Sequence, residues 1–365
     1  MKIRWRNLFF VIALTGSWNF ADAQNVKVTP IGQRTGEFCA QDRAILFEDP
    51  TGVRVLYDPG NTVAGPTDAR LGDVHVILIS HAHSDHLGNG KLNQNPDSPT
   101  SSCSSAVTTP APSTDTAEIA AAKKSAVIAG GPLSSVIGRL IAAVAGSATA
   151  GCPASGLTNE MIVPRTAACT AGLSPGAKRT VRHVSGTRGV QISMVTAIHP
   201  SDLSNGFLAD PDRTSLSTAG LAVGIANGFV VIFTNGLSVY LSGDTGLTSD
   251  METIVGGYFG ADLAVINMGD IFTTGPEEAA FAVTEFIRPA SVIPSHVNEA
   301  ATQGGRAVAG SRTARFLELL SRGSNRQGSE HRFKGAGGLS VFLPLSGVTM
   351  EFNGRGRCEV GCQGR

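Results

Sequence analysis

The protein has 365 residues, of which 29 are Lys or Arg and 29 are Asp or Glu, so its formal net charge is zero. A chain this neutral gives no overall support for nucleic-acid binding. The length is compatible with one large domain or two small ones, and the 44 glycines and 16% charged residues are compatible with a compact, loop-rich fold.

The N-terminus has the order of a secretory signal peptide. Three basic residues among the first six precede an apolar run from Leu8 to Leu14, and Ala-Asp-Ala follows at positions 21–23. The alternative is a membrane anchor, but the run is far shorter than the ~20 residues that span a bilayer. We therefore expect residues 1–23 to be a cleavable signal peptide and residues 24–365 to form a single domain. The mature protein would be periplasmic or secreted, without a stable membrane span.

The first half of the mature chain predicts strands joined by turns. Residues 44–47 and 53–57 are extended apolar segments, and the Asp-Pro-Thr-Gly between them predicts a hairpin. Residues 74–79 are nearly all apolar, which is typical of a strand buried on both faces. This third strand ends just before His81, so it would place that side chain at the edge of a sheet.

Two stretches interrupt this pattern. Residues 93–116 are rich in Ser, Thr and Pro and predict an inserted surface loop. A strand at 125–129 and a helix at 132–144, with proline near its first turn, precede a second insertion over about residues 146–177. Each insertion either shapes access to a site or only decorates the surface.

The second half predicts a similar alternation of strands and helices. A hairpin is expected around Asn235 and Gly236, because Asn-Gly is the strongest short turn pair. The expected strands lie at residues 190–195, 220–234, 238–241, 263–267, 291–295 and 339–343, and the expected helices at 276–287 and 306–320.

An even number of cysteines in an exported chain favours disulfide bonds. Spacing suggests that Cys152 and Cys169 could staple the second insertion and that Cys358 and Cys362 could close a short loop, but the sequence alone leaves the pairing open. A cysteine-ligated metal site is disfavoured because no C-x-x-C motif occurs. The six cysteines are Cys39, Cys103, Cys152, Cys169, Cys358 and Cys362.

Histidine and aspartate residues gather where predicted strands end. The motif H-x-H-x-D-H follows the strand at 74–79, and three single residues follow later apolar runs. Residues at the ends of neighbouring strands converge on one edge of a sheet. Imidazole and carboxylate bind borderline divalent metals, and seven such groups suffice for two metals with a shared ligand. The seven candidates are His81, His83, Asp85, His86, His199, Asp244 and His296.

The motif and its downstream partners resemble the metallo-β-lactamase-fold superfamily. The stretches Gly-Asp-Thr-Gly from Gly243, Gly-Pro-Glu-Glu-Ala from Gly275 and Val-Ile-Pro-Ser-His ending at His296 resemble a narrower branch, which contains metal-dependent hydrolases similar to ascorbate-6-phosphate lactonase. The match covers most of the mature chain outside the two insertions. It implies an α/β fold, an αββα sandwich with two surface insertions and with metals at the shared edge of its sheets.

The resemblance also implies which residues hold which metal. His81, His83 and His199 would hold one ion, Asp85, His86 and His296 the other, and Asp244 would bridge them. Two metals roughly 3.5–4 Å apart can share a water, lower its pKa to supply hydroxide, and polarise a carbonyl or phosphoryl oxygen. Zinc is expected first, and manganese or iron would fit similar ligands. Asp85 would also act in catalysis, orienting the nucleophile or managing a proton.

Four further residues are weaker candidates. Asp58, in Tyr-Asp-Pro-Gly, matches a family aspartate that supports a ligand histidine, although an aspartate closing a turn gives the same pattern. Asn298 and Glu299 follow His296 and could touch substrate. His183 is expected to be a surface or structural histidine rather than part of the cleft.

These observations favour an exported, dinuclear metal-dependent hydrolase acting on a lactone, ester or related small molecule. A phosphodiesterase of the same fold is the main alternative, because the same site would stabilise an in-line displacement. A true β-lactamase is less favoured, because those enzymes commonly lack an aspartate bridge at the position of Asp244. A metal-binding envelope protein without turnover is the alternative from a different class.

Overall fold

The computed structural model describes residues 24–92, 103, 107–110, 113–157, 159–203, 221–322 and 338–362. The predicted signal peptide and most of the first predicted insertion lie outside these residues. None of the described helices is both long and apolar enough to cross a membrane.

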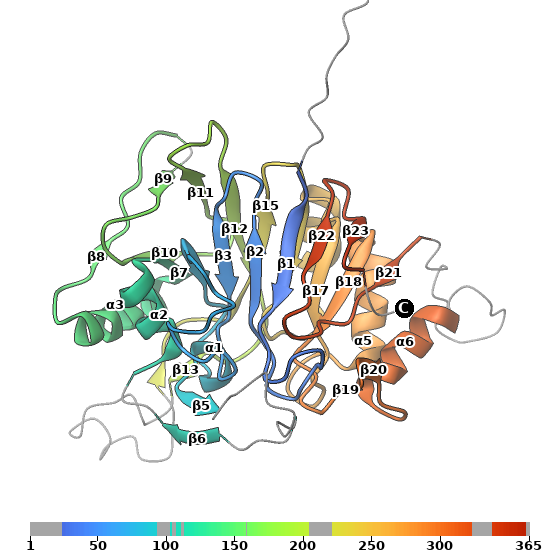
Figure 1. The fold of residues 1–365 in the computed structure, drawn as a ribbon. Helices are drawn as coiled ribbons and strands as arrows, with labels where there is room; N and C mark the ends of the chain where they lie inside the picture. The colour runs from blue at the N-terminus through green and yellow to red at the C-terminus, as the bar shows by residue number, and fades with distance from the viewer. Residues whose placement is uncertain are drawn as a thin grey trace, which may run out of the picture.

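Two large mixed sheets form the centre of the molecule (Figure 1). The first has the order β23-β22-β1-β2-β3-β4-β7-β10-β8 and the second β21-β18-β17-β16-β15-β12-β11-β9. The strands of the first sheet are β1 (Val26–Pro30), β2 (Ile45–Glu48), β3 (Arg54–Tyr57), β4 (Val76–Leu78), β7 (Ala126–Gly130), β8 (Ala150–Gly151), β10 (Cys169–Leu173), β22 (Met350–Phe352) and β23 (Cys358–Val360). Those of the second are β9 (Glu160–Val163), β11 (Lys178–His183), β12 (Val190–Thr196), β15 (Asn227–Ile232), β16 (Ser238–Leu241), β17 (Leu263–Asn267), β18 (Ser291–Ser295) and β21 (Ser340–Val341).

Short elements complete the described fold. The helices are α1 (Ser84–Leu87), α2 (Asp115–Lys123), α3 (Gly131–Ala145), the π-helix η2 (Met251–Tyr258), α5 (Pro276–Phe281), the π-helix η3 (Ala282–Ile287) and α6 (Arg312–Arg322). Three two-stranded ribbons pair β5 (Gly90–Leu92) with β6 (Val107–Pro110), β13 (Asp202–Leu203) with β14 (Leu221–Ala222), and β19 (Thr302–Gln303) with β20 (Arg306–Ala307).

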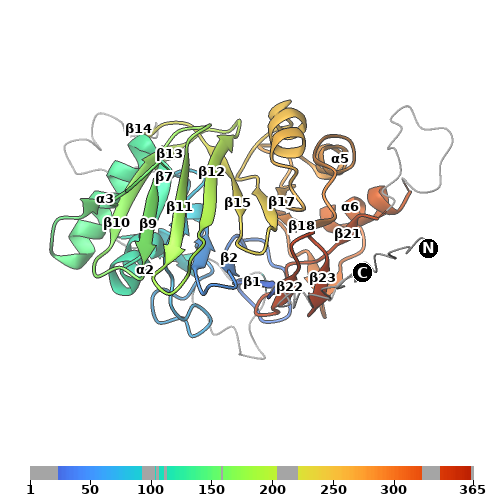
Figure 2. The ribbon, with the colours of Figure 1, turned by 90° about the horizontal axis from the view of Figure 1, so that it is seen from above.

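Three apolar clusters show that the layers are helix, sheet, sheet and helix. The largest joins the inner faces of both sheets, with Phe47 of β2 and Phe229 of β15 among its fully buried members. A second packs α2 and α3 on the outer face of the first sheet, and a third packs η2, α5, η3 and α6 on the outer face of the second. Seen from above, α5 lies beyond β17 and β18, on the side away from β1 and β22 (Figure 2). The predicted αββα sandwich is confirmed.

Local patterns predicted the central strands of both sheets and some of the helices. The hairpin expected over residues 44–57 is the antiparallel pair β2–β3, and the one around Asn235 and Gly236 is the pair β15–β16. Gly236 has a φ of +98°, which an L side chain rarely adopts, so the turn requires glycine at this position. The helix predicted at residues 132–144 is α3.

Several expectations were wrong in detail. The segment 146–177 is not a surface insertion, because its strands β10 and β9 pair in parallel with β7 and β11 and so extend both sheets. The helix expected from residue 306 begins only at Arg312, because residues 306–307 pair with β19. The helix over 276–287 changes from α to π at Ala282. The sequence patterns did not predict β22, which pairs with β1.

All six cysteines are paired. The structure has the disulfides Cys39–Cys103, Cys152–Cys169 and Cys358–Cys362. The two pairs suggested by spacing are therefore confirmed. The third joins residues 64 positions apart, which spacing alone could not indicate.

Candidate metal centre

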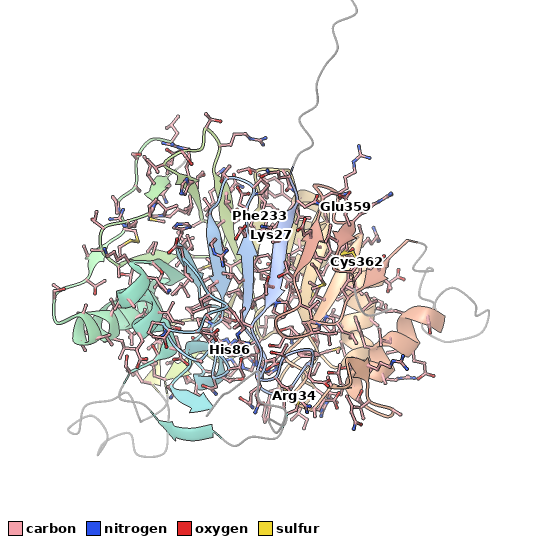
Figure 3. The ribbon with its side chains drawn as sticks, in the orientation of Figure 1. Lys27, Arg34, His86, Phe233, Glu359 and Cys362 are labelled. Carbon is pink, nitrogen blue, oxygen red and sulfur yellow. A yellow bond between two sulfur atoms is a disulfide. The ribbon has the colours of Figure 1, made fainter. Side chains whose placement is uncertain are left out.

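Strand ends bring the seven candidate ligands to one edge of the sandwich. β4, β12, β16 and β18 end at Leu78, Thr196, Leu241 and Ser295, and one candidate follows each end within three positions: His81, His199, Asp244 and His296, with His83 two positions after His81. The four-residue helix α1 then carries Asp85 and His86. Figure 3 shows His86 at the lower end of the strands of the first sheet.

The seven side chains form two sets. Ligand atoms of the first set, His81, His83, His199 and Asp244, lie within 4.8 Å of one another, and so do those of the second set, Asp85, His86 and His296. This is the division that the family resemblance implied. Because each set offers at least three nitrogen or oxygen ligands, each could hold a divalent metal.

Asp244 lies between the two sets. Its Oδ2 is 2.9 Å from Nε2 of His296, 3.7 Å from Nε2 of His199 and 3.8 Å from Nε2 of His81. Its Oδ1 is 3.5 Å from Nε2 of His86. One carboxylate therefore faces histidines of both sets, as a bridging ligand must.

Three of the histidine nitrogens in the ligand sets are buried without a hydrogen-bond partner. Among the described residues, these are Nε2 of His81, Nε2 of His86 and Nδ1 of His296. An unpaired buried nitrogen costs free energy, so this pattern is uncommon in a folded protein. Burial also lowers the pKa of His81 well below its usual value, which keeps this imidazole neutral. A neutral imidazole with a free, buried nitrogen is the form that binds a metal.

The second set concentrates negative charge around one imidazole. Burial acts to lower the pKa of His86, but the carboxylates of Asp244, Asp85 and Asp58 outweigh it and raise the pKa well above its usual value. In turn, burial acts to raise the pKa of Asp244, but charges on the neighbouring histidines hold it well below its usual range. The three carboxylates therefore favour positive charge at and beside His86. A divalent metal would supply such a charge.

Comparison with known proteins agrees with this geometry. The β-lactamase superfamily domain matches residues 41–296, which is more than half of the chain. The chain belongs to the β-lactamase superfamily. It is 30% identical over 269 residues to a UPF0173 metal-dependent hydrolase of Cupriavidus taiwanensis, covering 69% of this chain and 71% of that protein. It is also 27% identical over 249 residues to a UPF0173 metal-dependent hydrolase of Methanosphaera stadtmanae, covering 68% and 77%.

A solved structure shares the fold. Igni18, a metallo hydrolase from Ignicoccus hospitalis, matches with a TM-score of 0.53 at 19% identity, over 90% of this chain and 99% of that one. Together with the ligand sets, the relatives establish this member of the β-lactamase superfamily as a metal-dependent hydrolase.

In this hydrolase Asp58 supports a histidine of the second set. Oδ2 of Asp58 lies 2.8 Å from Nδ1 of His86, and its two oxygens accept hydrogen bonds from the backbone N–H (2.9 Å) and the hydroxyl (2.7 Å) of Ser80. A carboxylate at Nδ1 keeps the proton there and leaves Nε2 free to bind. Asp58 also closes a turn, since it has a φ of +37° at the end of β3. The two roles expected for this residue, closing a turn and supporting a ligand histidine, are therefore compatible.

Ser80 is a contact that the sequence pattern did not reveal. Besides Asp58, its hydroxyl lies 2.9 Å from Nδ1 of His81. The residue precedes the histidine motif and follows β4, and serine there gives no distinct signal. The same hydroxyl lies 3.3 Å from Nδ1 of His86, so Ser80 contacts one histidine of each set as well as the carboxylate of Asp58.

Arg43 is the other residue that the sequence pattern missed. Its guanidinium donates to Oδ2 of Asp85 from Nε (3.2 Å) and Nη2 (3.0 Å), and Nη2 also donates to Oδ1 of Asn298 (2.7 Å). Burial acts to raise the pKa of Asp85, but the charges of His86 and Arg43 outweigh it and hold the pKa well below its usual value. Asn298, a residue that could touch substrate, accepts this hydrogen bond through its Oδ1.

The remaining candidates lie elsewhere. Glu299 is 3.6 Å from Arg312 and accepts a hydrogen bond from the backbone N–H of Thr313. The ring of His183 packs edge-on against His75, 5.7 Å between centroids. His75 precedes β4 whereas the ligand sets follow it, so His183 lies away from the candidate metal centre, as predicted.

Proposed function

We propose that this protein is an exported hydrolase that binds two divalent metals and cleaves a lactone, an ester or a related small molecule. The observation that carries the proposal is the pair of ligand sets facing one shared carboxylate, Asp244. Two metals bound there would lower the pKa of a water and polarise the scissile carbonyl. Zinc is the first candidate because the ligands are histidine and carboxylate, and manganese or iron would accept the same set.

The chain's own residues have separate tasks in this proposal. His81, His83 and His199 hold the first metal, while Asp85, His86 and His296 hold the second. Asp244 would be the ligand that the two metals share, because its carboxylate faces histidines of both sets. Since the pKa of Asp85 is held well below its usual value, this carboxylate acts as a ligand and an orienting acceptor rather than as a proton carrier.

The surroundings favour a substrate with an apolar part. Nδ1 of His199 lies 3.2 Å from the carbonyl oxygen of Phe272, and the side chains nearby in sequence are exposed: Ile198 63%, Ile271 80% and Phe272 76%. Arg43, which contacts Asp85 of the second set, donates to protein groups only. Exposed apolar side chains beside a candidate ligand suit the apolar part of an ester or lactone.

Two features support an extracytoplasmic location. Residues 1–23 have the sequence order of a signal peptide. The described cysteines are all disulfide-bonded, a state that persists in oxidising compartments. Both support the periplasm or the extracellular space as the site of action, which cell fractionation with a C-terminally tagged chain would test.

The decisive experiment combines metal analysis with a substrate panel. Purified residues 24–365, loaded with zinc, manganese or iron, should hold two metals per chain and hydrolyse members of a panel of lactones and carboxylic esters. Bis-phosphoesters and β-lactams in the same panel test the alternative enzymes. Two tightly bound metals without turnover of any panel member would instead favour a metal-binding envelope protein.

Asp244→Ala tests the shared ligand. It should lower the occupancy of both metals and abolish turnover, because both sets lose the same carboxylate. Asp49→Asn is a suitable control, since Asp49 is equally buried but accepts hydrogen bonds from Thr51 and Thr234 at the far end of β2. Normal activity in Asp244→Ala would exclude the bridging role.

A further inference from the structure

A buried arginine lies beside one ligand set and not beside the other. The side chain of Arg43 is 1% exposed, and its guanidinium contacts Oδ2 of Asp85. The same oxygen lies 3.3 Å from Nε2 of His296 and 3.7 Å from Nε2 of His86. A fixed positive charge is thus separated from the second metal position by a single carboxylate oxygen.

Arg43 cannot turn away from this oxygen to serve as a substrate anchor. Its five N–H groups make five hydrogen bonds: two with Asp85, one with Asn298, and one each with the carbonyl oxygens of Ala40 (2.9 Å) and Asp42 (3.2 Å). All donors are therefore used within the protein, and Asp85 is the ligand that the guanidinium contacts.

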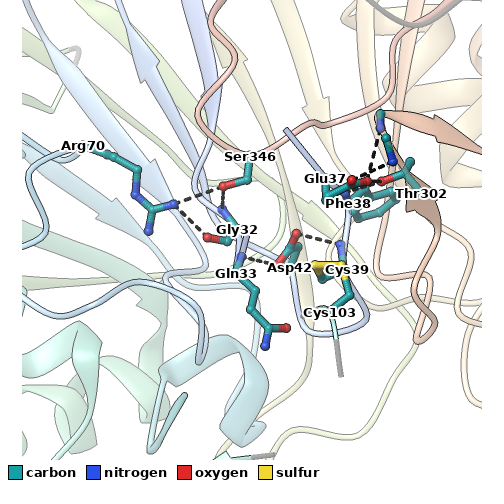
Figure 4. The surroundings of a disulfide bond; sticks show 12 residues. Gly32, Gln33, Glu37, Phe38, Cys39, Asp42, Arg70, Cys103, Thr302 and Ser346 are labelled. Carbon is teal, nitrogen blue, oxygen red and sulfur yellow. Dashed lines mark hydrogen bonds between the residues drawn. A yellow bond between two sulfur atoms is a disulfide. The ribbon is translucent and has the colours of Figure 1, made fainter. Parts of the chain in front are cut away.

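The loop before Arg43 is held in place from several sides. The carboxylate of Asp42 accepts the backbone N–H groups of Gln33 (2.7 Å) and Cys39 (2.8 Å), and Cys39 is disulfide-bonded to Cys103 (Figure 4). On the other side, Gly60 has a φ of +57°, and a Cβ there would lie 2.5 Å from the carbonyl oxygen of Asp85. The position of Arg43 beside Asp85 is thus built into the fold.

Among the described residues, no arginine or lysine contacts the first set. Its histidines have as hydrogen-bond partners the hydroxyl of Ser80, the carbonyl oxygen of Phe272 and, between His83 and His199 (3.3 Å), each other. None of these groups is a permanent cation. The electrostatic surroundings of the two sets are therefore unequal.

We propose that Arg43 weakens metal binding at the second set, so that the protein fills the set of His81, His83 and His199 first. The guanidinium repels a second cation and withdraws charge from Asp85, which makes this carboxylate a poorer ligand. Arg43 is a positioning residue that acts through Asp85, and it can act so only if the proposed two-metal site exists.

The test is a titration of metal-free residues 24–365 with Zn²⁺ in competition with a chromophoric chelator. The wild-type protein should show two binding steps, the second weaker than the first. Arg43→Met, which removes the charge but keeps the length, should tighten the second step by about tenfold or more, because one fewer positive charge repels the second ion, and should leave the first step unchanged. Arg43→Lys should restore the weak second step, because it keeps the charge.

A matched control and a second variant keep the result interpretable. Arg70→Met removes another arginine with a hydrogen-bonded carboxylate partner, Asp68, away from the ligand sets, and should leave both steps unchanged. Asn298→Asp leaves Arg43 in place but offsets its charge, and should also tighten the second step. It decides the matter if Arg43→Met does not fold.

The outcomes separate this proposal from the proposed function. A wild-type protein that binds none of zinc, manganese and iron would overturn both. Two wild-type steps, with a second step that is not tightened in folded Arg43→Met or in Asn298→Asp, would overturn the role of Arg43 and leave the two-metal site standing.

Discussion

Replacing Asp58 by asparagine should disable the second metal position while leaving the fold intact. In the native protein the carboxylate accepts three hydrogen bonds, two from Ser80 and one from Nδ1 of His86. An asparagine has one oxygen and one NH₂ group in the same place. If its oxygen keeps the backbone N–H of Ser80, its NH₂ faces His86, and the ring must carry its proton on Nε2 instead of Nδ1.

The magnitude follows from the contacts that are lost. An Nε2 that carries a proton cannot bind a metal, so His86 must adopt the unfavoured tautomer or leave a donor unpaired. A hydrogen bond to a charged group contributes about 1.5–3 kcal/mol. Loss of such a supporting partner lowers metal affinity about ten- to a hundredfold. We expect the full loss at the second binding step, because Asp58 contacts His86 directly, and a smaller loss at the first step, because Asp58 reaches His81 only through the hydroxyl of Ser80.

The assay is a chelator-competition titration of Asp58→Asn beside the wild-type protein, with urea unfolding of both metal-free proteins as a check on folding. Asp49→Asn is the control, because Asp49 is a buried carboxylate that holds the β2–β3 turn far from the ligands. It should lower stability and leave both metal affinities unchanged. Two binding steps of wild-type affinity in Asp58→Asn would refute the supporting role.

Two further changes test the packing and the electrostatics. A Cβ at Gly269 would lie 2.7 Å from Nδ1 of His296, so Gly269→Ala should displace this ligand and cost about 1–3 kcal/mol, seen as weaker second-metal binding. At Gly131 a Cβ would meet open space, so Gly131→Ala is the control and should bind the second metal as the wild-type protein does. Equal second-metal affinities in Gly269→Ala and Gly131→Ala would refute the displacement of His296. Burial lowers the pKa of His75 from 6.5, and its Nδ1 accepts the backbone N–H of Arg54. Its neutral form is favoured by folding, so its stabilising contribution is present above pH 6.5 and declines as the pH falls. The difference in unfolding free energy between the wild-type protein and His75→Asn should shrink on acidification, and a constant difference would contradict this assignment.

The sequence could predict the ligand sets because their positions follow from regular structure. His81, His199, Asp244 and His296 each come within a few residues of the end of an apolar strand, and period and length identify such strands locally. Asp58 could be predicted for the same reason, since it directly follows β3. Elements in which apolar residues do not recur at a regular spacing were missed or misplaced. Examples are β22, which was not predicted, and α6, which begins six residues later than expected.

By itself, then, the sequence determined the layered fold, the histidine motif and the convergence of seven ligands on one edge. Only the tertiary structure decided the surroundings of those ligands. Arg43 meets Asp85 across 42 positions and Asn298 across 255, from a loop whose conformation depends on a disulfide and a buried carboxylate. Such contacts join irregular segments, which carry no periodicity, so the charge balance between the two metal positions emerges only when the chain has folded.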